Sequence, residues 1–327
     1  MRFLPIHFVE ISKYLKRFLV LFFTLLSKIF PLYINIALGY IFSKYLKIKR
    51  DYIAFLLVYI LAPIVIFFAT LSLKLNIQLL FLPIFVFLFG SIIAFYILKK
   101  YKNDWSDSSI NTLSFTCGTG NTGYFGIPLA MLLLSHHDSN IFIFATLGSL
   151  LYENTTGFYV TAKGTFTTRQ SIMKIIKLPL IYAFIAGITL NILGFRIPEF
   201  IIPTFENLKW AYGILGMMML GMGMMGFNLK EDIDKKYLKI AYFFKFIFWP
   251  ASILFIILID RSFIGFLDES IYKVLFLFSI VPLAGNTVTL AVLLKAKPEK
   301  ASFTVLLSTL ISIIFIPVAL VIYEWLF

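Results

Sequence analysis

The chain has 327 residues, of which 60% are hydrophobic and 14% are charged. A water-soluble domain cannot bury that much apolar surface, so the composition excludes a soluble protein and indicates a membrane protein. The net charge of +13 does not indicate a nucleic-acid partner, because the basic residues stand at the ends of apolar stretches, as in the cytoplasmic loops of membrane proteins.

The chain begins with a basic segment, residues 1–19, that is more polar than the apolar stretches after it. It contains Arg2, Lys13, Lys16 and Arg17. An amphipathic helix lying at the membrane interface would accommodate these charges. The sequence therefore predicts an interfacial N-terminal segment over residues 1–19.

Ten apolar stretches come next, and each is predicted to be a spanning helix, because about 20 residues cross the hydrocarbon core. They lie at 20–43, Tyr52–Leu73, Leu75–Leu98, Ser108–His137, 140–162, 177–195, Trp210–Leu229, 240–259, Val274–Leu294 and Ala301–Tyr323. Lysine and arginine gather in the loops after the odd-numbered spans, which predicts that both termini lie outside the cell. The expected protein is an all-α, multi-pass protein of the plasma membrane.

Two halves of five spans each are predicted, over residues 20–168 and 169–327. Because five is odd, a second five-span unit must enter the membrane in the opposite orientation. Pro31-Leu32 and Gly39 open the first half, and Pro179-Leu180 and Gly187 open the second with the same internal spacing. The sequence therefore predicts two inverted repeats.

A shared tripeptide interrupts the fourth and the ninth span. Gly120-Asn121-Thr122 is followed by Gly123 and Pro128, and Gly285-Asn286-Thr287 is preceded by Pro282. Backbone that Pro and Gly release from a helix is tolerated at membrane depth only where protein or a water-lined cavity satisfies it. Paired interruptions of this kind predict two broken helices and a transporter's binding site between them.

The side chains at these breaks are candidates for binding an anion. Asn121 and Asn286 carry amide donors without a charge, and helix N-termini favour a carboxylate. Our hypothesis is that both amides bind substrate, assisted by Thr122 and Thr287, and that the prolines keep the helices broken. The alternative is that these side chains only cap helix ends or bridge neighbouring spans.

Glu153 is a carboxylate well inside an apolar stretch, Ile141–Ala162. An acid at membrane depth is a functional candidate, because burying it ionised is costly, and Glu153 is a candidate carrier of a coupling proton. The alternative is a structural pair with a cation such as Lys245 of the eighth span. For Lys245 itself, a long side chain that reaches the membrane interface is expected.

Several of these motifs together resemble the auxin efflux carrier family in its short prokaryotic form. The resemblance rests on Gly120-Asn-Thr-Gly-Tyr-Phe-Gly-Ile-Pro-Leu129, on Val281-Pro-Leu-Ala-Gly-Asn286, and on Leu307-Ser-Thr-Leu-Ile-Ser312 with Pro317. It covers roughly residues 20–327. No single motif is decisive, but their order and spacing are specific.

The resemblance implies two inverted five-helix repeats whose fourth and ninth spans are unwound and cross near the middle of the membrane. It also implies transport of small organic anions by an elevator-like movement of one subdomain, and it makes a homodimer plausible.

The expected function is that of a secondary active transporter of small organic anions such as carboxylates. The chain has no phosphate-binding Gly-Lys-Ser/Thr motif, so a gradient of protons, of sodium or of the substrate must drive it. No cofactor, no metal and no enzymatic activity are expected. The nearest alternative is a sodium-coupled organic anion symporter of the bile-acid type, and a remote one is a lipid-handling membrane enzyme.

Overall fold

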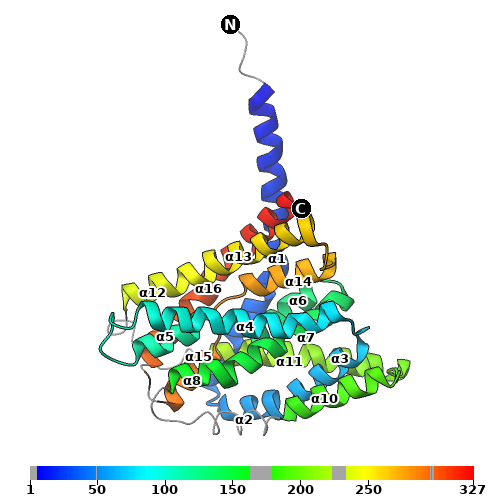
Figure 1. Ribbon diagram of the computed structural model, residues 1–327, viewed down its shortest axis with the longest axis horizontal. Coiled ribbons are helices and arrows are strands. Elements are labelled where there is room, and N and C mark those ends of the chain that lie inside the picture. Colours follow the sequence, from blue (N-terminus) through cyan, green and yellow to red (C-terminus); the bar gives the residue numbers. More distant parts are fainter. Residues whose placement is uncertain (1–5, 49, 163–178, 223–232, 295, 297) are drawn as a thin grey trace.

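The computed structural model describes residues 6–48, 50–162, 179–222, 233–294, 296 and 298–327, and its regular secondary structure is helical. Figure 1 shows a bundle of helices from which the N-terminal helix projects. The predicted boundary between the halves, at residues 168 and 169, lies outside the described residues.

The all-helical character expected from composition is confirmed. Within the described ranges, four helices are long and apolar enough to cross a membrane by themselves: Phe18–Tyr45, Ile77–Lys100, Lys235–Ile264 and Lys300–Leu326. Shorter apolar helices cover Leu56–Ser72 and Pro179–Ile192. Hydrophobic stretches of this length are typical of integral membrane proteins, since each backbone polar group is satisfied within the helix.

The helices fall on the ten predicted apolar stretches. The first part of the chain contains α1 (Ile6–Tyr45), α2 (Arg50–Phe55), α3 (Ala62–Ser72), α4 (Ile77–Lys100), α5 (Ser109–Cys117), α6 (Ile127–Leu133), α7 (His136–Tyr152) and α8 (Phe158–Thr161). The second contains α10 (Pro179–Ile192), α11 (Ile202–Met222), α12 (Lys235–Tyr242), α13 (Trp249–Ile259), α14 (Glu269–Ile280), α15 (Asn286–Leu293) and α16 (Pro298–Leu326). The number of membrane crossings and the inverted repeat stay predictions.

Short π-helical turns join several of these helices into longer ones. They lie at Leu56–Leu61 between α2 and α3, at Glu153–Gly157 between α7 and α8, and at Phe243–Phe248 between α12 and α13. A further π-helical turn, Asp260–Ile264, continues α13, and a 3-10 turn, Glu199–Ile201, precedes α11. Each joined run is therefore one continuous helix for the purpose of spanning a membrane.

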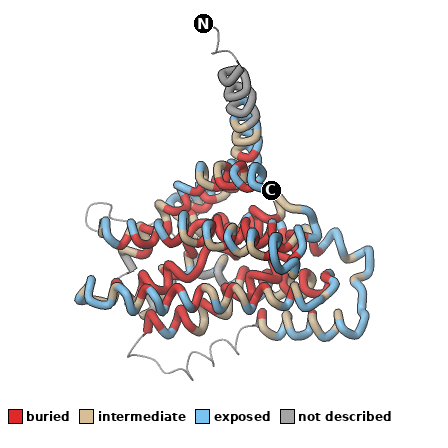
Figure 2. Tube along the Cα trace, turned by 45° about the horizontal axis from the view of Figure 1, so that its top comes forward, coloured by how far each residue is buried: buried red, intermediate tan, exposed pale blue. Residues whose placement is uncertain are grey.

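The core forms where helices distant in sequence pack together: α1 against α11, α3 against α10, and α4 against α5 and α7. Figure 2 shows the buried residues concentrated inside the bundle. The α1–α11 contact depends on glycine. A Cβ atom added to Gly39 would collide with the backbone of Met218, and one added to Gly221 would collide with that of Ile36. Small residues allow this approach of two backbones, as they do in many membrane helix pairs.

The seventh predicted span requires a correction. The apolar stretch Trp210–Leu229 is bounded by a charge at Lys209, but α11 begins at Ile202, and residues 223–229 lie outside the described part. Lys209 is tolerated inside the helix because its side chain, 1% exposed, is paired. Its Nζ lies 3.1 Å from Glu206 Oε1 and 3.3 Å from Asn140 Oδ1.

The N-terminal segment predicted over residues 1–19 is not separated from the first span by a helix end. The helix α1 runs without interruption from Ile6 to Tyr45, through Pro31. Figure 1 shows its first turns extending beyond the rest of the bundle. An interfacial position for residues 1–19 stays a prediction.

Asp234 connects three parts of the chain at the start of α12. Its Oδ2 accepts hydrogen bonds from Lys300 Nζ at 2.8 Å and from Trp105 Nε1 at 2.7 Å, and its Oδ1 caps α12 through the Tyr237 N–H at 3.0 Å. Burial opposes ionisation of Asp234, but the bonds from Lys300, Tyr237 and Trp105 outweigh it and lower its pKa to about 2.

We expect Asp234→Asn to lower stability by about 2 kcal/mol near neutral pH, since each pKa unit corresponds to about 1.4 kcal/mol. Because the pKa of Asp234 is lower when folded than when unfolded, this contribution is complete above about pH 4 and disappears as pH falls toward 2. The check is the apparent unfolding temperature in detergent against pH. Asp104→Asn is the matched control: Asp104 pairs with the exposed Lys236 at 3.0 Å, and such pairs contribute at most about 1 kcal/mol. Equal acid sensitivity of the two variants would contradict the assignment.

Candidate functional site

Two helix breaks form the centre of the site. The helix α5 ends at Cys117, and helical structure resumes at Thr122 with a π-helical turn that leads into α6. The helix α14 ends at Ile280 and α15 begins at Asn286. The residues between are rich in glycine and include Pro282, which has no N–H to continue a helix. Both predicted interruptions are therefore present as breaks.

The two breaks are in direct contact. The Asn121 N–H donates a hydrogen bond to the Pro282 carbonyl oxygen at 2.7 Å. Gly120 permits this approach: an added Cβ would lie 2.6 Å from Lys245 Nζ and 2.9 Å from Val281 Cγ2. The second break is held from α16 as well, where Ser308 Oγ accepts a hydrogen bond from the Leu283 N–H at 3.1 Å. The freed backbone of each break is thus bonded to protein, as membrane depth demands.

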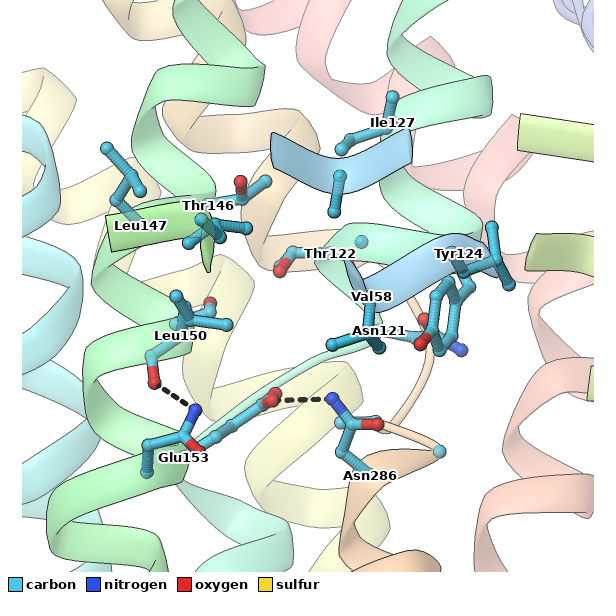
Figure 3. Close-up of a pocket in the computed structure, with 18 of the residues that line it drawn as sticks. Val58, Asn121, Thr122, Tyr124, Ile127, Thr146, Leu147, Leu150, Glu153 and Asn286 are labelled. Carbon is cyan, nitrogen blue, oxygen red and sulfur yellow. Dashed lines mark hydrogen bonds between the residues drawn. The ribbon is translucent and has the colours of Figure 1, made fainter. Parts of the chain in front are cut away.

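A cavity of about 280 Å³ lies beside this crossing. Its polar wall is formed by residues from both breaks and from the α7–α8 helix: Asn121, Thr122, Asn286, Ser149, Glu153 and Asn154. Figure 3 shows Asn121 and Asn286 on separate segments, with Glu153 pointing toward Asn286. Aliphatic side chains such as Leu57, Val65 and Leu147 and the rings of Tyr124 and Tyr212 complete the wall. An apolar cavity with a few converging polar groups is the usual form of a small-molecule site.

Asn121 combines a structural role with an unused donor. Its Oδ1 accepts a hydrogen bond from the Phe125 N–H at 3.3 Å and so caps the helix that leads into α6. Its Nδ2 is buried and has no hydrogen-bond partner among the described residues. Because the Phe125 N–H requires an acceptor, the amide orientation is fixed with its two donors away from the cap. A buried donor without a partner is costly, and an acceptor in the cavity would remove that cost.

Asn286 is engaged by Glu153. The Asn286 Nδ2 donates to Glu153 Oε2 at 2.7 Å (Figure 3). Thr119 Oγ1 donates to Glu153 Oε1 at 3.1 Å. The carboxylate therefore joins the two breaks, since Thr119 lies within the first and Asn286 directly follows the second. Asn286 is exposed, so the cavity is open on its side.

The remaining predicted site residues divide into two groups. Thr122, Gly120, Gly123 and Gly285 line the cavity. Thr287 does not, because its buried Oγ1 is turned to the Ala284 carbonyl within its own break. Neither proline lines the cavity: Pro128 lies in the first turn of α6, and Pro282 supplies the carbonyl that accepts from Asn121.

Lys245 lies at the crossing rather than at a membrane interface, which corrects the expectation for its side chain. It is 1% exposed, with Nζ 5.2 Å from the centre of the Trp249 ring. Among the described residues no acidic side chain pairs with it, so Glu153 is not its partner. Trp249 Nε1 donates to the Cys117 carbonyl at the end of α5. The ammonium thus lies close to a helix C-terminus, where positive charge is favourable.

Tyr212 is a wall residue that the sequence interpretation did not identify. It comes from α11, and its hydroxyl would lie 3.2 Å from a Cβ added to Gly123. Its ring is 6.1 Å from that of Tyr124. The only signal in the sequence was a tyrosine in an apolar stretch, which is common at membrane interfaces and therefore not informative.

Comparison with known proteins relates the chain to a membrane transporter. No family model matches the chain. Over 234 residues, which are 67% of this chain and 74% of the relative, it is 31% identical to the uncharacterized transporter MJ1031 of Methanocaldococcus jannaschii. The all-helical fold and the long apolar helices agree with that relationship. The chain therefore belongs to the same family of membrane transporters as this archaeal protein.

Proposed function

We propose that the protein is a secondary active transporter of small organic anions such as carboxylates, in the manner of the auxin efflux carriers that its motifs resemble. Its substrate would bind beside the crossing of the two broken helices, reached alternately from the two sides of the plasma membrane. The relationship to an archaeal transporter supports the general function, and the site supports the class of substrate.

The observation that carries the proposal is the unpartnered Asn121 amide at the wall of the cavity. A carboxylate there would accept from Nδ2, and the amino ends of the helices that begin at Thr122 and Asn286 would contribute partial positive charge. Lys245, buried at the same crossing without lining the cavity, adds a positive charge to the surroundings when its amine is protonated. These groups favour an anion over a neutral or cationic substrate.

Glu153 couples the substrate to a proton in this proposal. An ionised carboxylate in the cavity wall repels an anionic substrate, so the two are incompatible unless Glu153 is protonated. A proton on Oε2 would also displace the Asn286 donor from that oxygen and release its amide for the substrate. Proton and anion would then favour each other's binding, and this coupling is reciprocal.

The decisive test compares Asn121→Asp with Asn121→Ala in purified protein reconstituted into liposomes. Aspartate keeps the oxygen that caps the helix but removes both donors and adds a negative charge. If Asn121 binds the anion, alanine should weaken apparent carboxylate affinity about 10- to 100-fold, the usual effect of losing one hydrogen bond to a charged group, and aspartate should weaken it further. If Asn121 is only a cap, aspartate should transport as well as asparagine, since aspartate is an equally good N-cap.

Uptake is measured with labelled mono- and dicarboxylates under imposed pH and sodium gradients. Asn111→Ala is the matched control: its Nδ2 donates to the Val160 carbonyl at 2.7 Å, and it does not line the cavity. Transport per folded molecule should be unchanged in that variant. Uptake that depends on sodium rather than on pH would assign the chain to the sodium-coupled alternative.

A further inference from the structure

A second cavity, of about 320 Å³, lies on the other side of the second break. It is enclosed by α1, the end of α11, the start of α15 and α16, with a wall that includes Tyr33, Ala37, Tyr40, Leu220, Val305 and Leu310. Gly285 belongs to the walls of both cavities. The second cavity is thus separated from the proposed substrate site by the backbone of the break itself.

The wall of this cavity is suited to an apolar occupant. The polar groups in it are largely engaged within the protein: the Tyr33 hydroxyl lies 2.8 Å from Ser312 Oγ and donates to the Thr309 carbonyl at 3.0 Å, and Thr309 Oγ1 donates to the Val305 carbonyl at 3.0 Å. Water requires several polar partners and does not fill an apolar cavity of this kind. An engineered apolar cavity of about 150 Å³ stays dry and takes up benzene, so this one has room for a longer hydrocarbon.

The cavity opens toward the lipid. Leu310, in its wall, is 48% exposed, and Leu38 and Ile314 on the neighbouring faces of α1 and α16 are 37% and 63% exposed. In a membrane these faces contact hydrocarbon chains, which are the apolar molecules present at the highest concentration. A chain entering from the bilayer would lose no hydrogen bond and would fill an otherwise empty space between α1 and α16.

A cation stands at one end of the opening. Lys44, near the end of α1, is exposed, and its Nζ lies 5.5 Å from the centre of the Tyr40 ring, which is part of the wall. Exposed lysines next to a membrane surface favour anionic lipid headgroups. We propose that the cavity binds one acyl chain of an anionic phospholipid whose phosphate is held by Lys44, and that this chain contacts the break at Gly285.

The test is phospholipid binding to the purified full-length protein by native mass spectrometry. The protein is delipidated and titrated with phosphatidylglycerol or with phosphatidylcholine of the same chain length. Ala37→Phe fills the cavity from α1, and Val305→Phe fills it from α16. Ala251→Phe places the same ring on an exposed position of α13 that lines neither cavity.

Wild-type protein and Ala251→Phe should bind one added phosphatidylglycerol tightly. Both cavity-filling variants should fail to bind it while still eluting as folded monodisperse protein. Lys44→Gln should weaken binding of phosphatidylglycerol about fivefold, the contribution expected of one basic residue at a membrane surface, and weaken that of phosphatidylcholine less, because its choline cation offsets the charge of the phosphate. Equal retention by all four proteins would overturn the proposal, as would an equal loss in Ala251→Phe. A bound lipid that Lys44→Gln does not affect would overturn the headgroup assignment. Because binding is measured without transport, these outcomes are independent of the proposed function.

Discussion

Gly120→Ala should abolish transport, although it adds a single methyl group. The new Cβ would lie 2.6 Å from Lys245 Nζ, 2.9 Å from Val281 Cγ2 and 3.3 Å from the Pro282 carbonyl. The end of the Lys245 side chain can move away, but Val281 and Pro282 are buried parts of the second break, so we expect the methyl group to push the breaks apart and weaken the bond from the Asn121 N–H to Pro282. Overpacking of this kind costs about 1–3 kcal/mol, and we expect a measurable loss of stability as well. The measurements are carboxylate uptake in liposomes and the apparent unfolding temperature.

A second substitution separates this explanation from general misfolding. Val281→Ala removes the Cγ2 atom that the added methyl group would meet, so the double variant Gly120→Ala/Val281→Ala should recover part of both transport and stability. Val281→Ala alone is the control and should have a smaller effect than Gly120→Ala, because it vacates space rather than overfilling it. Strictly additive losses in the double variant would show that the two breaks do not meet as described.

Glu153→Gln should eliminate substrate accumulation driven by a proton gradient while preserving exchange of labelled for unlabelled substrate. Glutamine resembles the protonated acid in shape and charge, so the site would remain able to bind the anion but would have no proton to release. If Glu153 had only a structural role, Glu153→Gln would either abolish both accumulation and exchange or leave both unchanged. The two assays on one preparation therefore distinguish coupling from folding.

The matched control for this prediction is Glu269→Gln. Glu269 pairs with Arg261 at the surface, with a side chain that is 62% exposed. Its replacement should leave accumulation and exchange unchanged. Proton-driven accumulation that survives Glu153→Gln, or wild-type uptake that does not depend on pH, would remove Glu153 from the mechanism.

Much of this fold was predictable because lipid imposes a strict length and composition on its helices. The apolar stretches and the breaks at Gly120–Thr122 and Pro282–Gly285 appear in the sequence as runs of apolar residues and as polar interruptions. The Asn121 and Asn286 positions beside one cavity follow the same logic, since broken helices require partners. The role of either amide in transport stays a prediction until tested.

Other features could not be predicted from the sequence, because they depend on which side chains contact each other between packed helices. Lys209 and Lys245 look alike as single lysines in apolar surroundings, yet Lys209 is paired with Glu206, whereas Lys245 has no acidic partner in the described part of the chain. Thr122 and Thr287 occupy equivalent places in the two tripeptides, but only Thr122 reaches the cavity. Such differences arise from the rotation of each helix about its axis, which periodicity cannot fix where nearly every residue is apolar.

The glycine contact between α1 and α11 has a consequence for how the protein can move. Where Gly39 and Gly221 let two backbones touch, there is no layer of side chains to shear, so these helices must travel as one rigid unit. If the protein alternates between two states as proposed, the boundary of its moving part lies elsewhere, and cross-linking α1 to α11 should leave turnover intact.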